Sequence, residues 1–283
     1  MKKMKKLPNL FIVGVGKSGT TSLYQYLKFH PDIYMSPLKE PHFLADKQKL
    51  KEHFDIDFSQ VITNEEQYFS LFQKAKNEKI LGEASTSYLY YVEPEVIKKK
   101  FPNSKIIIML RNPVERAWSH YLMAIRDGFI NPNTPFSKAI EDFPIIVKLG
   151  FYSKNVRKYI ESFQNDIYVI LFDEFKKNTQ TIIKCVYRFL EVDSTFSPEI
   201  KTYNASAIPT SVFSFYLLKM NRKFKLYKFV PKFVRKKIKP LLLKNMKKEM
   251  PQRDKYFLLE LYKKDIIELS KIINKDVSYW LEI

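Results

Sequence analysis

Residues 8–27 read PNLFIVGVGKSGTTSLYQYL, and this stretch decides the fold class of the chain. It contains a short, continuous apolar run, Leu10 to Val13, which is typical of a strand buried on both faces in a parallel sheet. Glycines then interrupt the run, and from Thr20 onward apolar residues recur at helical spacing. The segment therefore predicts a strand, a tight loop and a helix in direct succession.

The loop between this strand and helix has the composition of an anion-binding site. The amides of residues 16 to 22 would point into one concavity at a helix N-terminus, where free N–H groups and the helix dipole favour an anion. Lys17 adds a full positive charge. Hydroxyl donors would come from Ser18, Thr20, Thr21 and Ser22, which stand beside the glycines Gly16 and Gly19. We therefore expect a phosphate or sulfate group to bind here.

A loop of the ATP- or GTP-binding kind is the alternative. That loop requires Gly-x-x-x-x-Gly-Lys-Ser/Thr, and the position of its first glycine is Phe11 here, inside the predicted strand. A second clear strand, Lys105 to Leu110, is followed by Arg111 instead of the acid that would bind Mg²⁺. Both observations favour a donor whose phosphates are held by cations and amides alone, without a metal.

The chain is long and apolar enough to fold around a large core. Of its 283 residues, 45 % are apolar and 15 % aromatic, which excludes a disordered chain. Its one cysteine, Cys185, excludes a disulfide within the chain. We expect a single domain over residues 1–283, with residues 200–283 as its basic, helical C-terminal portion. No apolar stretch reaches the about 20 residues of a membrane span, and no signal-peptide cleavage site is visible, so we expect a cytoplasmic protein.

Positive charge is concentrated near the C-terminus. The formal net charge is +19, and residues 200 to 248 contain no Asp or Glu, whereas Lys and Arg crowd between Lys219 and Lys248 among apolar residues. This pattern fits basic amphipathic helices docked on an anionic membrane surface, which would make the protein peripheral to the membrane. It also fits a groove for an acidic polysaccharide, or a solvated face whose aromatics pack inward. No usual nucleic-acid-binding module is visible, so nucleic acid is not an expected partner.

Strand and helix patterns alternate along the first 190 residues. Further strands are predicted at the start of 79–91, at 105–110 and at 166–172. Helices are expected at 64–75, 95–101, 113–126, 136–143 and 155–163, and a last one at 254–274. This alternation predicts an α/β fold, a P-loop-like parallel sheet flanked by helices on both faces. Ligands would bind at the carboxyl ends of its strands.

Two motifs resemble those of sulfotransferases that use 3′-phosphoadenosine 5′-phosphosulfate (PAPS). GVGKSGTTSLYQYLKFHPDI, residues 14–33, resembles their 5′-phosphosulfate loop, and RNPVERAWSHY, residues 111–121, resembles their 3′-phosphate motif. KEPHFL, residues 39–44, is similar to an acceptor-side segment of the heparan sulfate N- and 3-O-sulfotransferases. The resemblance to this family, in a bacterial-type form, implies PAPS as donor, adenosine 3′,5′-bisphosphate (PAP) as product, and no metal.

The resemblance also implies roles for individual residues on the donor side. Lys17 would contact the 5′-phosphosulfate and stabilise the leaving phosphate. Arg111 would pair with the 3′-phosphate through its planar fork, and Ser119, eight residues later, would add a donor. The cradle around the 5′-phosphosulfate would consist of Gly16, Ser18, Gly19, Thr20, Thr21 and Ser22.

On the acceptor side, the resemblance implies that Glu40 is the base that removes the proton from the attacking group. His42 is the alternative base, because its ordinary pKa lies near neutrality. Lys39 would assist at the acceptor, and Glu83 would orient either the acceptor or Lys17.

The expected function is therefore transfer of the sulfuryl group from PAPS to a hydroxyl or amine of a carbohydrate or lipid-linked acceptor, by in-line displacement. Two other classes remain open. One is a kinase-like protein that uses ATP or GTP, and the other is a non-catalytic protein that binds polyanions or membranes.

Overall fold

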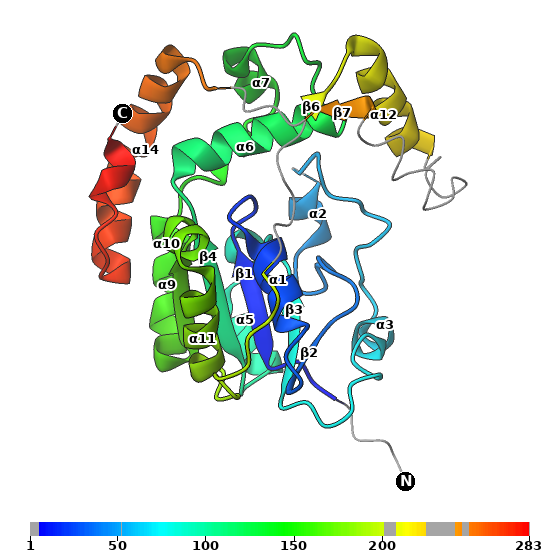
Figure 1. The fold of residues 1–283 in the computed structure, drawn as a ribbon, viewed down its shortest axis with the longest axis vertical. Helices are drawn as coiled ribbons and strands as arrows, with labels where there is room; N and C mark the ends of the chain where they lie inside the picture. Colours follow the sequence, from blue (N-terminus) through cyan, green and yellow to red (C-terminus); the bar gives the residue numbers. More distant parts are fainter. Residues whose placement is uncertain (1–5, 52, 201–207, 225–240, 245–248, 283) are drawn as a thin grey trace.

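Figure 1 shows the computed structural model, which describes residues 6–51, 53–200, 208–224, 241–244 and 249–282. Its centre is a five-stranded sheet in the order β2-β3-β1-β4-β5, in which every neighbouring pair is parallel. The strands are β1 (Leu10–Gly14), β2 (Ile33–Met35), β3 (Ile80–Ala84), β4 (Lys105–Leu110) and β5 (Ile167–Leu171). The predicted α/β fold with a parallel sheet is thus confirmed.

The helices connect these strands and cover both faces of the sheet (Figure 1). Those before the C-terminal region are α1 (Thr20–Leu27), α2 (Lys47–Leu50), α3 (Glu65–Ser70), α4 (Tyr88–Tyr91), α5 (Pro94–Lys100), α6 (Pro113–Arg126), α7 (Phe136–Asp142), α8 (Ile145–Lys148), α9 (Ser153–Phe163), α10 (Phe172–Lys177) and α11 (Thr179–Phe189). A short 3₁₀ turn, η1 (Gln164–Asp166), precedes β5.

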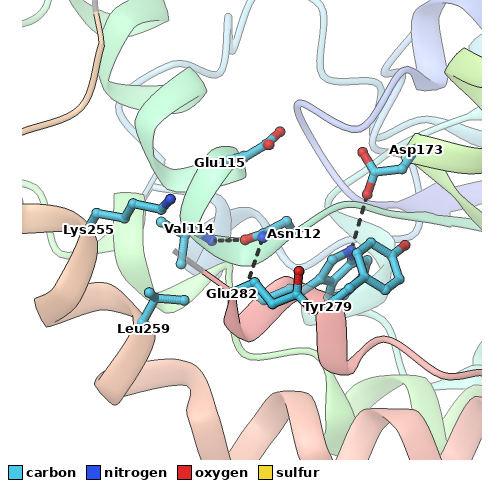
Figure 2. Close-up of a pocket in the computed structure, with 9 residues that line it drawn as sticks. Asn112, Val114, Glu115, Asp173, Lys255, Leu259, Tyr279 and Glu282 are labelled. Carbon is cyan, nitrogen blue, oxygen red and sulfur yellow. Dashed lines mark hydrogen bonds between the residues drawn. The ribbon is translucent and has the colours of Figure 1, made fainter. Parts of the chain in front are cut away.

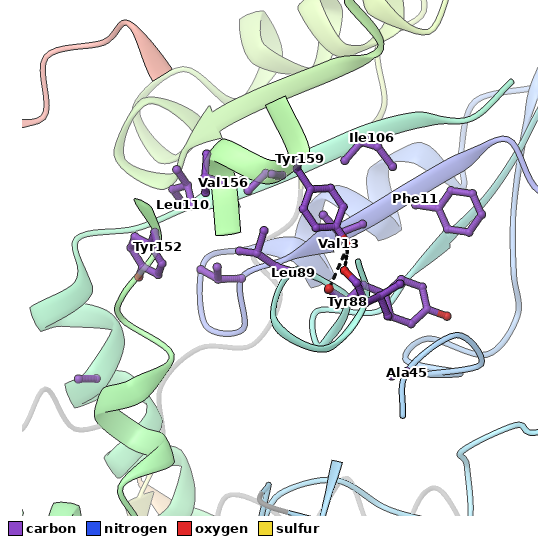
Figure 3. Close-up of a cluster of buried hydrophobic side chains, with 14 of the residues drawn as sticks. Phe11, Val13, Ala45, Tyr88, Leu89, Ile106, Leu110, Tyr152, Val156 and Tyr159 are labelled. Carbon is purple, nitrogen blue, oxygen red and sulfur yellow. Dashed lines mark hydrogen bonds between the residues drawn. The ribbon is translucent and has the colours of Figure 1, made fainter. Parts of the chain in front are cut away.

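Strand β1 divides the core into two layers because its side chains alternate between the faces of the sheet. Leu10 and Ile12 join buried residues of α1 and α11 on one face. Phe11 and Val13 face the other layer, which is formed with α4, α5, α6 and α9 (Figure 3). There the Tyr159 hydroxyl donates to the Tyr88 carbonyl oxygen at 3.0 Å, which ties α9 to α4. A strand buried on both faces explains the continuous apolar run.

Helix α6 lies across the carboxyl ends of the strands, above the loop that follows β1 (Figure 1). Its start is well defined: Asn112 accepts the N–H of Val114 at 2.9 Å, and Pro113 occupies the first helical position. The last residue of β4, Leu110, is therefore followed at once by Arg111 and the helix start. This connection places Arg111 beside the β1 loop.

The C-terminal region packs against the sheet domain through α14 (Gln252–Ile273) and the 3₁₀ turn η3 (Ser278–Leu281). Asp265 of α14 accepts hydrogen bonds from the amide of Tyr152 at 2.8 Å and from the amide of Ser153, and so caps the start of α9. Helix α12 (Val212–Phe224) and two short antiparallel strands, β6 (Ile208–Pro209) and β7 (Leu243–Lys244), complete the described part. Much of the basic stretch 219–248 lies outside the described residues.

The structure differs from the expected elements in several places, among them the short helices α4 and α8, which were not predicted. β2 occupies part of a segment that gave no strand prediction, because three residues are too few to show alternation. Helix α3 ends at Ser70 instead of Ala75, and turns follow it. The β6–β7 pair was not predicted either, because each strand has two residues and depends on its distant partner.

Candidate functional site

The loop after β1 presents a row of free backbone amides. The amides of residues 16 to 21 have no backbone acceptor among the described residues, whereas Val15 donates to the Met109 carbonyl oxygen and Ser22 to that of Gly19. Gly19 stands at the N-cap of α1 with φ of 89°. A Cβ there would lie 2.9 Å from the Phe172 ring, so both the backbone conformation and the packing require glycine. This arrangement is that of an anion-binding helix N-terminus.

The hydroxyl groups of the loop divide into two sets. Thr20, Thr21 and Ser22 line a large cavity together with Gly16, Lys17 and Gly19. Ser18 is fully buried, and its Oγ lies 2.8 Å from the Met109 carbonyl oxygen and also contacts that of Val15. Its hydroxyl therefore faces the backbone of β4, and Ser18 is not part of the cavity wall.

Lys17 supplies an unpaired positive charge to this cavity. Its ammonium group has no hydrogen-bond or ion-pair partner in the described part of the chain. Burial, reinforced by the charges of Arg126 and Arg111, lowers the pKa of Lys17 to about 8. An anion that binds beside this ammonium stabilises its charged form, so burial of the cation favours anion binding.

Arg111 lies next to the loop and is held from three sides. Its Nη1 donates to the Lys17 carbonyl oxygen at 3.1 Å, its Nη2 pairs with Glu115 at 2.9 Å, and its guanidinium stacks 4.9 Å from the centre of the Phe172 ring. The Tyr152 hydroxyl donates to the Arg111 carbonyl oxygen at 3.0 Å and so fixes its backbone. Ser119 lines the same cavity from α6. The two residues of the predicted 3′-phosphate motif thus meet at the cavity that contains the loop.

The cavity has a volume of about 930 Å³, near the upper end of the range of about 300–1,000 Å³ that is usual for small-molecule sites. Its walls come from the β1 loop, the segments 39–42, 53–60 and 86–90, helix α6, and the α10 region. Loops from four parts of the sequence therefore converge at the carboxyl ends of the strands.

Glu40 lies on the wall of this cavity with about a quarter of its side chain exposed. Its carboxylate accepts the amide of Thr86 at 2.7 Å and the ammonium of Lys39 at 2.5 Å. Burial alone would raise the pKa of Glu40, but Lys39, His42 and the Thr86 amide outweigh it and hold the pKa below its ordinary value. Glu40 is therefore an ionised, oriented carboxylate at neutral pH.

His42 is more enclosed than Glu40. Its Nδ1 lies 2.7 Å from the Ser87 hydroxyl, and its Nε2 lies 3.9 Å from a Glu40 carboxylate oxygen. Burial lowers the pKa of His42, so the imidazole is neutral at pH 7. It also lines the cavity.

Lys17, Glu40 and His42 share an unusual backbone conformation, with φ of 73°, 62° and 52°. Side chains other than glycine rarely adopt this left-handed region, which costs on the order of 1–3 kcal/mol per residue. Strain of this kind concentrates where a structure holds side chains for a ligand. All three predicted catalytic residues carry it.

Glu83 occupies a different place from the one expected. It is fully buried in β3 and is absent from the cavity wall. Its carboxylate accepts the hydroxyls of Tyr68 at 2.8 Å, Tyr88 at 2.9 Å and Ser85 at 2.9 Å, and burial raises its pKa to about 7. The Ser85 hydroxyl in turn accepts the His42 amide at 3.2 Å. Glu83 therefore supports the segment that carries Glu40 and His42, and in this structure it does not reach the acceptor side of the cavity.

Sequence reasoning missed a group of titratable residues on the wall of the same cavity. His53 and Asp55, from the loop after α2, and Arg116 and His120, from α6, all line the cavity. The segment HFDID, residues 53–57, shows no periodicity that would have indicated a site. Only the tertiary fold brings this loop against α6.

A smaller cavity of about 320 Å³ lies near the C-terminus (Figure 2). Two of its residues are joined to Trp280: Asn112 donates to the Trp280 carbonyl oxygen at 3.1 Å, and the Trp280 indole N–H donates to Asp173 at 3.1 Å. This cavity is part of a structural clamp between η3, α6 and α10. No described helix combines the length and the hydropathy of a membrane span.

Comparison with known proteins gives a consistent assignment. Human carbohydrate sulfotransferase 15 is 25 % identical over 250 residues, which cover 67 % of this chain and 45 % of the relative. The membrane-associated sulfotransferase kil1 of Dictyostelium discoideum is 31 % identical over 142 residues, which cover 49 % of this chain and 28 % of the relative. The chain thus spans less than half the length of these relatives.

Among solved structures, the crystal structure of a sulfotransferase from Alicyclobacillus acidocaldarius superposes with a TM-score of 0.73 at 27 % identity, and the match covers 97 % of this chain and 99 % of that one. Residues 8–197, which include the β1 loop, Arg111 and Ser119, match the model of the sulfotransferase family. The likeness extends over the sheet, the loop and the motif on α6, and the chain belongs to the sulfotransferase family.

Proposed function

We propose that this protein transfers the sulfuryl group of PAPS to a hydroxyl or amine of a carbohydrate acceptor. One observation carries the proposal. Gly16, Lys17, Gly19, Thr20 and Thr21, whose amides have no backbone acceptor among the described residues, border one cavity with the Lys17 ammonium, which has no partner there either, and with Arg111. A ligand with two separate anionic groups fits this arrangement, and PAPS carries a phosphosulfate and a 3′-phosphate.

The donor would bind with its phosphosulfate on the β1 loop. The amides, the hydroxyls of Thr20, Thr21 and Ser22, and Lys17 would surround the bridging and terminal oxygens. Arg111 and Ser119 would hold the 3′-phosphate, for which Arg111 would exchange part of its contact with Glu115, an exposed partner. Each of these contacts binds anions without a metal.

In the transfer step, the acceptor oxygen or nitrogen attacks the sulfur while the bond from sulfur to the phosphate oxygen breaks. The electron pair of that bond leaves on the 5′-phosphate of PAP, where Lys17 and the amides stabilise the charge. The proton of the attacking group passes to a carboxylate oxygen of Glu40, which stays ionised until then. His42, 3.9 Å from Glu40, is the alternative proton acceptor.

A carbohydrate acceptor is supported by the name of the human relative, a carbohydrate sulfotransferase, and by the polar cavity wall around Glu40. A lipid-linked saccharide would present the same hydroxyl groups. Both acceptors remain within the proposal.

We also propose that the C-terminal region meets an anionic membrane surface. Phe213, Tyr216 and Met220 are exposed and lie on one face of α12, because they are three and four residues apart, and Lys219 is exposed beside them. An apolar helix face flanked by lysine binds such a surface, and one relative is named membrane-associated. The wild type should sediment with vesicles that contain anionic lipid, and a smaller fraction of the Phe213→Ser variant should do so. Equal sedimentation with neutral vesicles would contradict this proposal.

The donor assignment is tested by calorimetric titration with PAP, run beside ATP with Mg²⁺. The wild type should bind PAP, and Arg111→Ala should bind it at least about tenfold more weakly, because a charge-assisted pair is lost. Lys138→Ala is a matched control: Lys138 is an exposed cation of α7 outside the cavity. Binding of ATP with Mg²⁺ but not of PAP would favour a kinase-like protein instead.

A further inference from the structure

Four side chains on the cavity wall form a group that the proposed donor site does not use. They are His53, Asp55, Arg116 and His120, which we call the histidine–aspartate cluster. His53 Nε2 and Arg116 Nε are buried and have no hydrogen-bond partner among the described residues, whereas the buried Asp55 Oδ1 and His120 Nε2 take part in the contacts between the carboxylate and the imidazoles. Each such atom costs about 1–3 kcal/mol if it stays unpaired. Two such atoms on one cavity wall indicate polar groups whose partner is not supplied by the protein.

The cluster holds one carboxylate in a fixed orientation. Asp55 lies between two imidazoles, with Oδ1 3.6 Å from His53 Nδ1 and Oδ2 3.3 Å from His120 Nε2. Behind them, Arg116 Nη1 lies 3.4 Å from His120 Nδ1, and Nη2 donates to the Ile146 carbonyl oxygen. The Phe54 ring stacks on His120 at 5.2 Å. The carboxylate is therefore held by groups that are themselves packed.

The Asp55 carboxylate is more exposed than the two imidazoles that hold it. The side chains of His53 and His120 are 7 % and 3 % exposed, whereas that of Asp55 is 24 % exposed. Burial alone would raise the pKa of Asp55, but the two imidazoles outweigh it and hold the pKa well below the ordinary value. Asp55 is therefore an anion on the cavity wall, held by the two histidines, and Arg116 contacts His120.

The cluster lies near the donor groups but shares no residue with them. Arg116 and His120 belong to the same helix as Ser119, but His120 contacts Asp55 of the 53–55 loop, which contributes nothing to the predicted phosphate contacts. The charge of Asp55 reaches Lys17, whose pKa it raises slightly against the larger effect of burial. The cluster thus lies within electrostatic range of the transfer site and shares a cavity with Glu40.

A fixed anion on the wall of this cavity selects its ligand by charge. A carboxylate accepts hydrogen bonds from one or two hydroxyls of a sugar ring, and it repels a carboxylate or sulfate at the same place. We propose that Asp55 binds a hydroxyl-bearing, uncharged sugar ring of the acceptor, with His53, His120 and Arg116 as positioning residues. This inference rests on the proposed function, because it assigns the acceptor end of the same cavity.

The experiment measures sugar binding directly, by saturation-transfer NMR on the complex with PAP. The probes are the neutral disaccharides lactose, cellobiose and N-acetyllactosamine, and a heparosan tetrasaccharide, which contains glucuronate. The wild type should bind at least one neutral probe in preference to the tetrasaccharide. Asp55→Asn should weaken that binding about tenfold or more, since a charge-assisted hydrogen bond is lost. Asp166→Asn, the same change at an exposed aspartate that is absent from the cavity wall, should bind as the wild type does.

A second variant tests the positioning role of His120. It also keeps the inference testable if Asp55→Asn fails to fold. With the neutral probe as acceptor, His120→Gln should raise the KM for the sugar and leave both kcat and PAP affinity unchanged. The inference is overturned if no neutral probe binds the wild type, if the tetrasaccharide is preferred, or if Asp55→Asn and His120→Gln both behave like Asp166→Asn. PAP titration of each protein separates the two proposals: a wild type that does not bind PAP refutes the proposed function itself.

Discussion

The lowered pKa of Lys17 makes donor binding dependent on pH above neutrality. In the free protein, burial and two neighbouring arginines bring this pKa from 10.5 to about 8. The donor is an anion, so it binds the protonated ammonium. At pH 7 nearly all of the protein carries that form, and at pH 9 only about one molecule in ten does. Binding at pH 9 must therefore draw in a proton, and PAP affinity should be about tenfold lower than at pH 7.

Calorimetry measures this effect in two ways. PAP is titrated at pH 7, 8 and 9, each in two buffers of different ionisation enthalpy, so that affinity and proton uptake are obtained together. Uptake should rise from near zero at pH 7 toward one proton per site at pH 9. Lys17→Arg is the matched control, because its guanidinium stays charged throughout and should show neither trend. Constant affinity in the wild type, with no proton uptake, would show that Lys17 is not the cation that meets the donor.

Three further changes test the remaining parts of the site and its support. Glu40→Gln should keep PAP affinity but lower the transfer rate by on the order of 100-fold or more, as followed with radiolabelled PAPS; an unchanged rate would transfer the role of base to His42. Trp280→Ala should lower the free energy of unfolding by about 3–5 kcal/mol in urea titrations, because it empties a buried site and breaks the contact with Asp173; a loss below 1 kcal/mol would refute the clamp. Glu83, with its pKa raised to about 7, stabilises the fold below pH 4.5 and loses that contribution of roughly 3 kcal/mol as pH rises through 7, so the stability of the wild type relative to Glu83→Gln should fall over this range; a constant difference between the two proteins would refute the assignment.

The elements nearest to the anion-binding loop could be predicted closely from the sequence. Lys105–Leu110 and Pro113–Arg126 form the strand and the helix with the predicted bounds. Their signals are local: a continuous apolar run for the strand, and a proline at the first turn with a helical apolar face for the helix. The short strand Ile33–Met35 escaped prediction, because pairing with β3 forms it and its own three residues carry little pattern.

The sequence by itself determined the class of fold and the loop that binds an anion, because both depend on residues adjacent in the chain. Glycine placement, Lys17 and the helix start all lie within a few positions of one another. The tertiary structure decided which polar side chains share the cavity. It moved Glu83 behind the wall, turned the Ser18 hydroxyl toward β4, and joined Asp55 to His120 across 65 positions of sequence. These contacts join residues that are far apart in the chain and depend on how the loops pack against α6. No local sequence pattern indicates that packing.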